Sequence, residues 1–225
     1  MHKALLFAVV TLAAIVTSSR SHACVDTALV LAVDGSGSIS DEEYEFQKSA
    51  IVAAFRDRQV LSAIRASGTV AVAAVFWGDG EFPAQIIDWT VMDGIKPSQK
   101  FADEIEKSER VVFGNTDIGD GLWVALELLS RSHACARRQI VDISGDGMET
   151  TRPRRRRSVS LLQARQRAQE MGVTINALAI SDEETDLADY YNDRVILGSD
   201  RFVMNIRKFE DFARAIRLKL IRELS

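Results

Sequence analysis

The sequence predicts an α/β fold, a doubly wound and mostly parallel six-stranded sheet with helices on both faces. Two observations support this prediction. Apolar runs of strand length alternate with helical patterns, which is the order of a sheet built from crossover connections. The runs are also almost continuously apolar, as expected of strands that are buried on both faces. The predicted strands are Thr27–Val33, Thr69–Trp77, Ala84–Val91, Gln139–Ser144, Val173–Ile180 and Arg201–Ile206.

The N-terminal segment 1–23 is predicted to be a secretory signal. Lys3 precedes an apolar stretch, and Ser21-His22-Ala23 forms a small-x-small cleavage pattern. The apolar stretch, about 13 residues long, is too short to cross a bilayer as a helix. No second long apolar run follows, so we expect an exported chain without a membrane span, periplasmic or extracellular, with a single domain over residues 24–225.

The two cysteines, Cys24 and Cys135, both lie in the predicted mature chain. An even number of cysteines in an oxidising compartment favours pairing, so we predict a Cys24–Cys135 disulfide. Two free thiols are one alternative. A lipoprotein attached at Cys24 is another, although Ser21 stands where a lipid-attachment signal usually has a large aliphatic residue.

The charge balance argues against nucleic acid as a partner. The chain carries 28 basic and 32 acidic residues, a net charge of −4. Loss of the signal removes Lys3 and Arg20 and makes the mature protein more acidic still. A nucleic-acid-binding domain usually shows the opposite balance.

The start of the first helix is predicted by Ser40-Asp41-Glu42-Glu43. This is a capping box, in which the side chains of Ser40 and Glu43 satisfy each other's free backbone N–H groups. We expect this helix to continue to about Ala66. Helical patterns or apolar stripes predict four more helices, over Ser98–Arg110, 118–129, Ser158–Met171 and 209–220.

Polar side chains gather where the predicted strands end. Asp34-Gly35-Ser36-Gly37-Ser38 follows the first strand, Gly114-Asn115-Thr116-Asp117 precedes a helix, and Ser144-Gly145-Asp146-Gly147 follows the fourth strand. Ligands of doubly wound sheets bind beyond the carboxyl ends of the strands, where the strand order reverses. Carboxylate and hydroxyl oxygens are the ligands that hard divalent cations prefer. These loops therefore predict a metal site.

The three motifs occur in this order along nearly the whole mature chain and resemble those of the von Willebrand factor type A (vWA) family. This family includes the integrin inserted domains, and its members have a Rossmann-like fold. The resemblance implies a metal-ion-dependent adhesion site (MIDAS). By position, the metal residues would be Asp34, Ser36, Ser38, Thr116 and Asp146. The hard oxygen set suits Mg²⁺, and Ca²⁺ or Mn²⁺ would also fit. In the family the cation accepts a further oxygen from a Glu or Asp of a protein partner.

The sequence departs from the family pattern at two positions. Gly145 stands where the family usually has a threonine, and Asp117 adds a negative charge directly after Thr116. Asp142, inside an apolar strand, is interpreted as a structural acid that needs a hydrogen-bonding partner if it is buried.

Other interpretations of the same residues stay open at this point. Thr116 could cap the following helix, and Asp34 or Asp146 could hold a turn. The protein could be a structural envelope component whose metal only stabilises the loops. A Mg²⁺-dependent phosphohydrolase with Asp34 as nucleophile is disfavoured, because no second acid stands two residues later and no Gly-Lys-Ser/Thr phosphate loop is present. We therefore expect a binding protein and not an enzyme.

The arginine-rich run 152–157 is interpreted as a solvated loop. The alternative is that it attracts acidic partners to the nearby metal site. Replacing Arg154–Arg157 with serine would then slow association with an anionic partner and leave metal affinity nearly unchanged.

Overall fold

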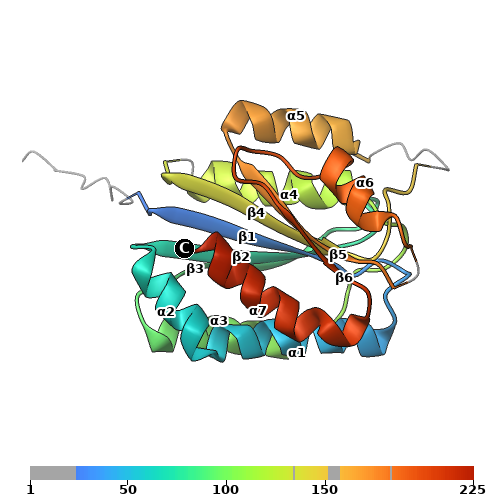
Figure 1. Ribbon diagram of the computed structural model, residues 1–225. Coiled ribbons are helices and arrows are strands. Elements are labelled where there is room, and N and C mark those ends of the chain that lie inside the picture. The colour runs from blue at the N-terminus through green and yellow to red at the C-terminus, as the bar shows by residue number, and fades with distance from the viewer. Residues whose placement is uncertain (1–23, 134, 152–157, 183) are drawn as a thin grey trace, which may run out of the picture.

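A computed structural model describes residues 24–133, 135–151, 158–182 and 184–225 of the protein (Figure 1). The predicted signal segment and the arginine run 152–157 lie outside the described residues. Six strands form one sheet in the order β3-β2-β1-β4-β5-β6, and only β3 runs antiparallel to its neighbour. The strands are β1 Thr27–Asp34, β2 Val70–Trp77, β3 Gln85–Val91, β4 Arg138–Gly145, β5 Thr174–Ile180 and β6 Val203–Ile206.

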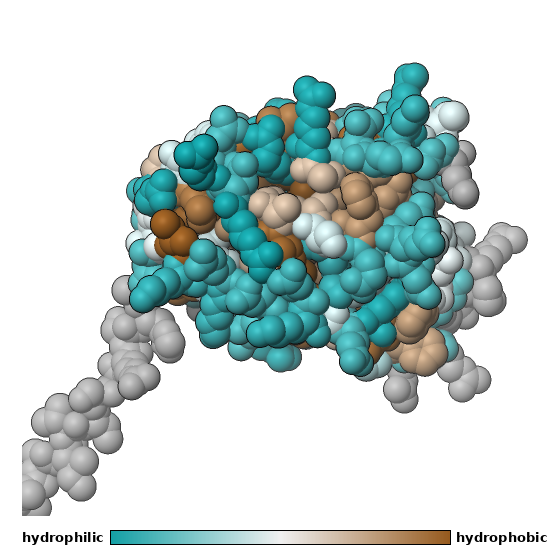
Figure 2. Space-filling model, turned by 90° about the horizontal axis from the view of Figure 1, so that it is seen from below, coloured by the Kyte–Doolittle hydropathy of each residue, from teal (hydrophilic) through white to brown (hydrophobic). Residues whose placement is uncertain are grey.

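Helices cover both faces of the sheet, as predicted (Figure 1). One layer holds α1 Asp41–Arg56, α2 Arg58–Ala66, α3 Ile95–Lys107 and α7 Phe212–Glu223, with a short 3₁₀ helix at Phe209–Asp211. The other layer holds α4 Ile118–Ser132, α5 Leu161–Met171 and α6 Leu187–Arg194. Figure 2 shows the outer surface of the first layer, where hydrophilic side chains surround a less polar central band.

Strand β1 lies at the centre of the sheet because each of its residues can be buried. Its alternate side chains point to opposite faces. Leu29, Leu31 and Val33 join the core beneath α1 and α7, whereas Val30 and Ala32 join the core beneath α4 and α5. The strand order reverses on either side of β1, because the chain continues to β2 on one side and later adds β4 on the other. The loops that leave β1 and β4 therefore meet at this switch point.

The prediction of one helix from Asp41 to about Ala66 is wrong. The capping box of Ser40 and Glu43 is present, with both of its hydrogen bonds. The helix ends at Arg56, however, because Asp57 is extended and starts a new helix. The Asp57 carboxylate accepts from the N–H of Gln59 at 2.8 Å and of Val60 at 3.2 Å. An aspartate that satisfies backbone donors in this way favours a new helix start over a continuous helix.

Three further elements differ from the predictions. Helix α3 begins at Ile95 and not at Ser98, and α5 begins at Leu161 after a second capping box between Ser160 and Gln163. The short helix α6 was not predicted at all, because it buries only two side chains, Leu187 and Tyr191, and so shows little apolar periodicity.

The predicted disulfide is confirmed. Cys24 and Cys135 are bonded, with their Cα atoms 5.4 Å apart. The bond ties the segment before β1 to the loop between α4 and β4. Over the described part of the chain, no helix combines the length and apolar character needed to cross a membrane.

Candidate metal centre

The loop after β1 turns back on itself at Asp34. One carboxylate oxygen of Asp34, Oδ1, accepts a hydrogen bond from the N–H of Ser36 at 2.8 Å. From α1, the Gln47 amide donates to the Asp34 carbonyl at 3.2 Å. Asp34 and Ser36 are fully buried. The start of the loop is thus held by hydrogen bonds to both the side chain and the carbonyl of Asp34.

The hydroxyl groups of Ser36 and Ser38 in this loop meet the hydroxyl of Thr116 and the carboxylate of Asp146. The Ser36 Oγ lies 3.2 Å from the Ser38 Oγ and 3.2 Å from the Thr116 Oγ1. The Ser38 Oγ donates to Oδ1 of Asp146 at 2.7 Å. The structure therefore brings together side chains from three loops that are far apart in the sequence, including all five residues predicted for the metal site.

Asp34 is a buried carboxyl group with one oxygen that accepts no hydrogen bond from the described part of the chain. No hydrogen-bond donor among the described residues reaches its second carboxylate oxygen, Oδ2. Burial, and secondarily the negative charge of Asp146, raise the pKa of Asp34 to about 7. Burial disfavours the charged form of a carboxyl group, and a nearby positive charge favours it. A buried carboxylate oxygen without a donor, beside a second carboxylate and three hydroxyls, is the donor set that a hard divalent cation fits.

A metal centre elsewhere finds little support. Within the described residues, no group of three or more His, Cys, Asp or Glu side chains is placed to hold a metal ion. A cation at this edge of the sheet would therefore have to use serine and threonine oxygens in addition to carboxylates.

The Thr116 loop is fixed from two sides. Gly114, with a φ of 83°, accepts from the N–H of Gly37 at 2.6 Å and thus joins the two loops. Only glycine adopts this conformation readily, and a Cβ at Gly114 would lie 2.7 Å from the Asp79 Cβ. On the other side, Thr116 and Thr150 exchange two hydrogen bonds, at 2.9 and 3.1 Å. Thr116 is consequently held with its hydroxyl toward Ser36.

Arg110 is a functional candidate that the sequence analysis missed. Its guanidinium donates to the carbonyls of Gly35, Ser36 and Ile39 at 2.9 to 3.0 Å. It also pairs with Asp41 at 2.7 Å and lies between two aromatic rings, those of Tyr44 and Phe113. Arg110 therefore binds the carbonyl groups of the β1–α1 loop, and the serine hydroxyls of the same loop face Thr116 and Asp146. A lone arginine between a helix and a loop gives no motif from which this role could be predicted.

Comparison with known proteins places the chain in a family. Residues 23–225 match the model of a family described as "Protein of unknown function (DUF1194)". The chain belongs to this family. No match was found among curated proteins.

Several solved structures share the fold of this DUF1194 chain. The pilus adhesin SpaC from Lactobacillus rhamnosus GG, in its open conformation, is 15% identical, with a TM-score of 0.62 over 90% of this chain and 30% of its own. A von Willebrand factor type A structure from Catenulispora acidiphila is 14% identical, with a TM-score of 0.54 over 89% and 43%. Proximal thread matrix protein 1 from the mussel byssus, with a zinc-occupied MIDAS motif, is 18% identical, with a TM-score of 0.54 over 88% and 46%.

The vWA fold predicted from the sequence is thereby confirmed. The chain spans about a third to a half of the length of these three proteins. The likeness establishes the arrangement of the sheet and its helices. It does not assign the activity of these proteins to this chain.

The first departure from the vWA pattern, Gly145, has a structural reason in this DUF1194 chain. A Cβ at Gly145 would lie 2.5 Å from the Tyr191 hydroxyl and 2.9 Å from Oδ2 of Asp34. The buried Tyr191, which donates to the Gly147 carbonyl at 3.4 Å, takes the space of the missing side chain. Tyr191 belongs to α6, the helix that the sequence did not reveal, so its position beside Asp34 could not be predicted either.

The other residues singled out in the sequence are structural in this arrangement. Asp117 is buried and accepts from the N–H of Gly80 at 2.7 Å, which ties α4 to the loop after β2. Asp117, and not Thr116, is the N-cap of α4, so the capping interpretation of Thr116 is wrong. Asp142 is buried and pairs with Lys219 at 2.6 Å, as expected of a structural acid with a partner.

Proposed function

We propose that this protein is an exported vWA module that holds a divalent cation at Asp34, Ser36, Ser38, Thr116 and Asp146 and binds an acidic group of a protein partner through it. The convergence of three hydroxyls and two carboxylates at the switch point of the sheet is the observation that carries this proposal. When bound, the cation would supply an electrophilic centre for the partner's carboxylate. Mg²⁺ is the cation that this oxygen set suits best, and Ca²⁺ or Mn²⁺ would also fit.

The protein residues have separate tasks in this proposal. Asp34 and Asp146 supply negative charge, and a cation would relieve their mutual repulsion. The hydroxyls of Ser36, Ser38 and Thr116 supply neutral oxygens, which leave more of the cation's charge for an incoming anion. The zinc-occupied MIDAS motif of the mussel byssus protein is a precedent for a metal on this fold.

Export is supported by the disulfide between Cys24 and Cys135, because such bonds persist in oxidising compartments. The segment 1–23, with its signal-like pattern, supports the same proposal. A periplasmic or an extracellular location both agree with these observations.

Binding is favoured over catalysis because the Asp34 carboxyl is enclosed. Asp34 is fully buried. A nucleophilic carboxylate has to reach the reacting atom. Phe113 and Met148, which adjoin the Thr116 and Asp146 loops in the sequence, are exposed apolar side chains available to a partner.

The first experiment measures binding of Mg²⁺ by calorimetry to the wild-type protein and to Asp34→Ala. We expect saturable binding to the wild type and a loss of about 1.4 kcal/mol or more, a factor of about ten, in the variant. Asp88→Ala, which removes an exposed carboxylate from β3, is the matched control and should bind like the wild type. Equal Mg²⁺ affinity in wild type and Asp34→Ala would contradict the proposed site.

The second experiment tests whether the cation serves a partner. Immobilised protein is exposed to an envelope extract with Mg²⁺ and again with a chelator. A protein captured with Mg²⁺, released by chelator and not captured by Asp34→Ala supports the adhesion role. Stabilisation of the fold by Mg²⁺ without any metal-dependent capture would instead support a structural metal.

A further inference from the structure

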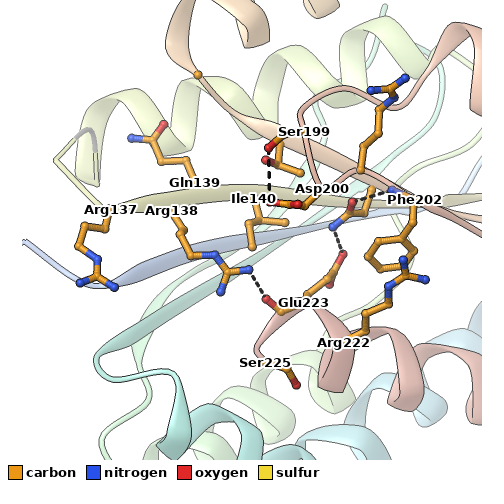
Figure 3. Close-up of a pocket in the computed structure, with 14 residues that line it drawn as sticks. Arg137, Arg138, Gln139, Ile140, Ser199, Asp200, Phe202, Arg222, Glu223 and Ser225 are labelled. Carbon is orange, nitrogen blue, oxygen red and sulfur yellow. Dashed lines mark hydrogen bonds between the residues drawn. The ribbon is translucent and has the colours of Figure 1, made fainter.

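A second cleft lies at the end of the sheet opposite to the candidate metal centre. It has a volume of about 790 Å³ and is bordered by the first residues of β4 and β5, the segment before β6 and the last turn of α7 (Figure 3). None of the residues proposed to hold the metal lines this cleft. The volume lies in the range of small-molecule sites, whose usual size is about 300–1,000 Å³.

Four arginines line the cleft, namely Arg137, Arg138, Arg201 and Arg222. Figure 3 labels three of them, Arg137, Arg138 and Arg222. Three of the four are held in place by the protein itself. Arg138 donates to the carbonyl of Glu223 at 2.7 Å, and Arg201 donates to the carbonyl of Gly198 at 3.0 Å. The guanidinium of Arg222 stacks over the Phe202 ring, 3.7 Å from its centre.

The positive charge of the cleft is poorly neutralised. Among the described residues, Arg138, Arg201 and Arg222 form no ion pair, and Arg137 approaches Asp26 only at 3.8 Å. A guanidinium that bonds a neutral carbonyl keeps its full charge and retains N–H donors for an oxyanion.

Two carboxyl groups also line the cleft, fewer than the four arginines, and Asp200 contributes one negative charge. Asp200 is exposed and hydrogen-bonds to Ser199 at 3.3 Å. Glu223 is buried and contacts Lys219 at 2.6 Å. Burial, and secondarily the charge of Asp142, raise the pKa of Glu223 to about 8, so it adds little negative charge at neutral pH.

The floor of the cleft is polar and rigid. The Asn176 amide is buried, donates to Oε1 of Glu223 at 2.9 Å and accepts from the N–H of Phe202 at 3.1 Å. Because Arg222 and Lys219 both lie against the Phe202 ring, that ring is not open to a ligand. Recognition in this cleft has to come from the guanidinium groups at its rim, whose planar donors match carboxylate and phosphate oxygens.

We propose that this cleft binds a small polyanion, a molecule that carries two or more carboxylate or phosphate groups. Arg138, Arg201 and Arg222 bind its oxyanions from three sides, since they come from β4, the segment before β6 and α7. The proposal does not depend on the proposed metal site, which lies at the other end of the sheet.

Calorimetry with citrate and pyrophosphate, at constant ionic strength and in metal-free buffer, tests this proposal. Citrate represents the carboxylate ligands and pyrophosphate the phosphate ligands, and saturable binding of one or both is expected. The double variant Arg138→Gln/Arg222→Gln should bind the same probe about tenfold more weakly or worse, since each lost charged hydrogen bond costs affinity. Arg201→Gln, on an exposed loop, tests the same cleft if the double variant fails to fold.

Two controls separate the cleft from other basic residues. Arg214→Gln removes an exposed arginine from the same helix, α7, outside the cleft. Replacement of Arg154–Arg157 by serine removes the arginine run. Both variants should bind the probes like the wild type. Absence of saturable binding for both probes, or binding that is lost with the run and retained in the cleft variants, would overturn the proposal.

Discussion

At the scale of single residues, Arg110 holds the loop that carries two of the candidate metal residues. The Arg110 side chain is only 10% exposed, and its guanidinium bonds to three carbonyls of the loop that carries Ser36 and Ser38. No other residue described here contacts both ends of that loop in this way. Arg110 is therefore a positioning residue, which acts on a cation only through the geometry of the serines.

Arg110→Lys should lower Mg²⁺ affinity even though it keeps the positive charge. A lysine ammonium cannot reproduce the planar, three-way donation of the guanidinium, so the serine hydroxyls lose their fixed position. We expect an affinity loss of about tenfold, measured by calorimetry. Arg56→Lys, which changes an exposed arginine paired with Asp103 and Glu106, is the control. Unchanged Mg²⁺ affinity in Arg110→Lys would show that the loop does not need this arginine.

The five candidate metal residues could be found from the sequence because they stand in short motifs at predicted strand or helix ends. Asp34, Ser36 and Ser38 are neighbours in the sequence, and Thr116 and Asp146 follow in a fixed order. Arg110 and Tyr191 could not be found in this way. Each acts through contacts with distant backbone groups, and such contacts leave no pattern along the chain.

At the scale of elements, a buried charged cluster fastens α7 to the sheet. Lys219 of α7 lies 2.6 Å from Asp142 of β4 and 2.6 Å from Glu223 one turn further on. Asn176 of β5 adds a hydrogen bond to Glu223. All four side chains are buried. Since two carboxyl groups face one ammonium group, the cluster balances its charge best when it holds one additional proton.

The stability of the fold should therefore decrease as the pH rises. Folding raises the pKa of Glu223 from 4.5 to about 8, through burial first and Asp142 second, with Lys219 acting in the opposite direction. Between these values the folded protein holds a proton that the unfolded chain releases. Glu223 alone should then lower the free energy of unfolding by about 1 kcal/mol per pH unit across this window, as measured by urea unfolding. Asp34 and Glu149, whose pKa values are both raised to about 7, should add to this fall below about pH 7.

Glu223→Gln removes this titration and keeps an oxygen that can accept from Asn176 and Lys219. We expect a flatter pH dependence in this variant and higher relative stability at the alkaline end of the window. Glu42→Gln, at an exposed position of α1, is the control. If the free energy of unfolding of Glu223→Gln fell with pH as steeply as that of the wild type, the titration would belong to another group.

The sequence predicts elements well where burial is periodic or continuous. All six strands appear near their expected places. Strands β1 and β2 are buried along their whole length, as expected of continuous apolar runs, whereas the edge strand β3 buries only Ile87, so the expectation of burial on both faces is wrong for it. The sequence does not predict the break at Asp57, because the apolar pattern continues through α2. The new helix start is marked only by the hydrogen bonds that the Asp57 carboxylate accepts from backbone N–H groups. The predicted sixth strand, Arg201–Ile206, is shorter in the structure, where β6 covers Val203–Ile206 at the sheet edge.

At the scale of the whole molecule, the disulfide between the two cysteines, Cys24 and Cys135, closes a covalent loop with a sequence separation of 111 residues. It links the start of the central strand β1 to the start of β4, its neighbour in the sheet. The two strands whose far ends carry Asp34 and Asp146 are therefore joined at their near ends as well.

Replacement of both cysteines by serine should lower the melting temperature. The chain-entropy model allows up to about 4–5 kcal/mol for a loop of this length. Thermal unfolding of the wild type, with and without reductant, and of the double variant measures the effect. Reductant should shift the wild type toward the variant and leave the variant unchanged. Equal melting temperatures for all samples would mean that the bond adds nothing to stability.

The arrangement of the chain ends has a practical result. Cys24 precedes β1, and the Glu223 carbonyl at the end of α7 bonds to Arg138 at the start of β4, so both ends of the described chain lie on the side away from Asp34 and Asp146 (Figure 1). A biosensor chip or a fluorescent fusion attached through either end would leave the cation-binding edge facing outward. Immobilised protein of this kind would present a uniformly oriented surface to a partner in flow.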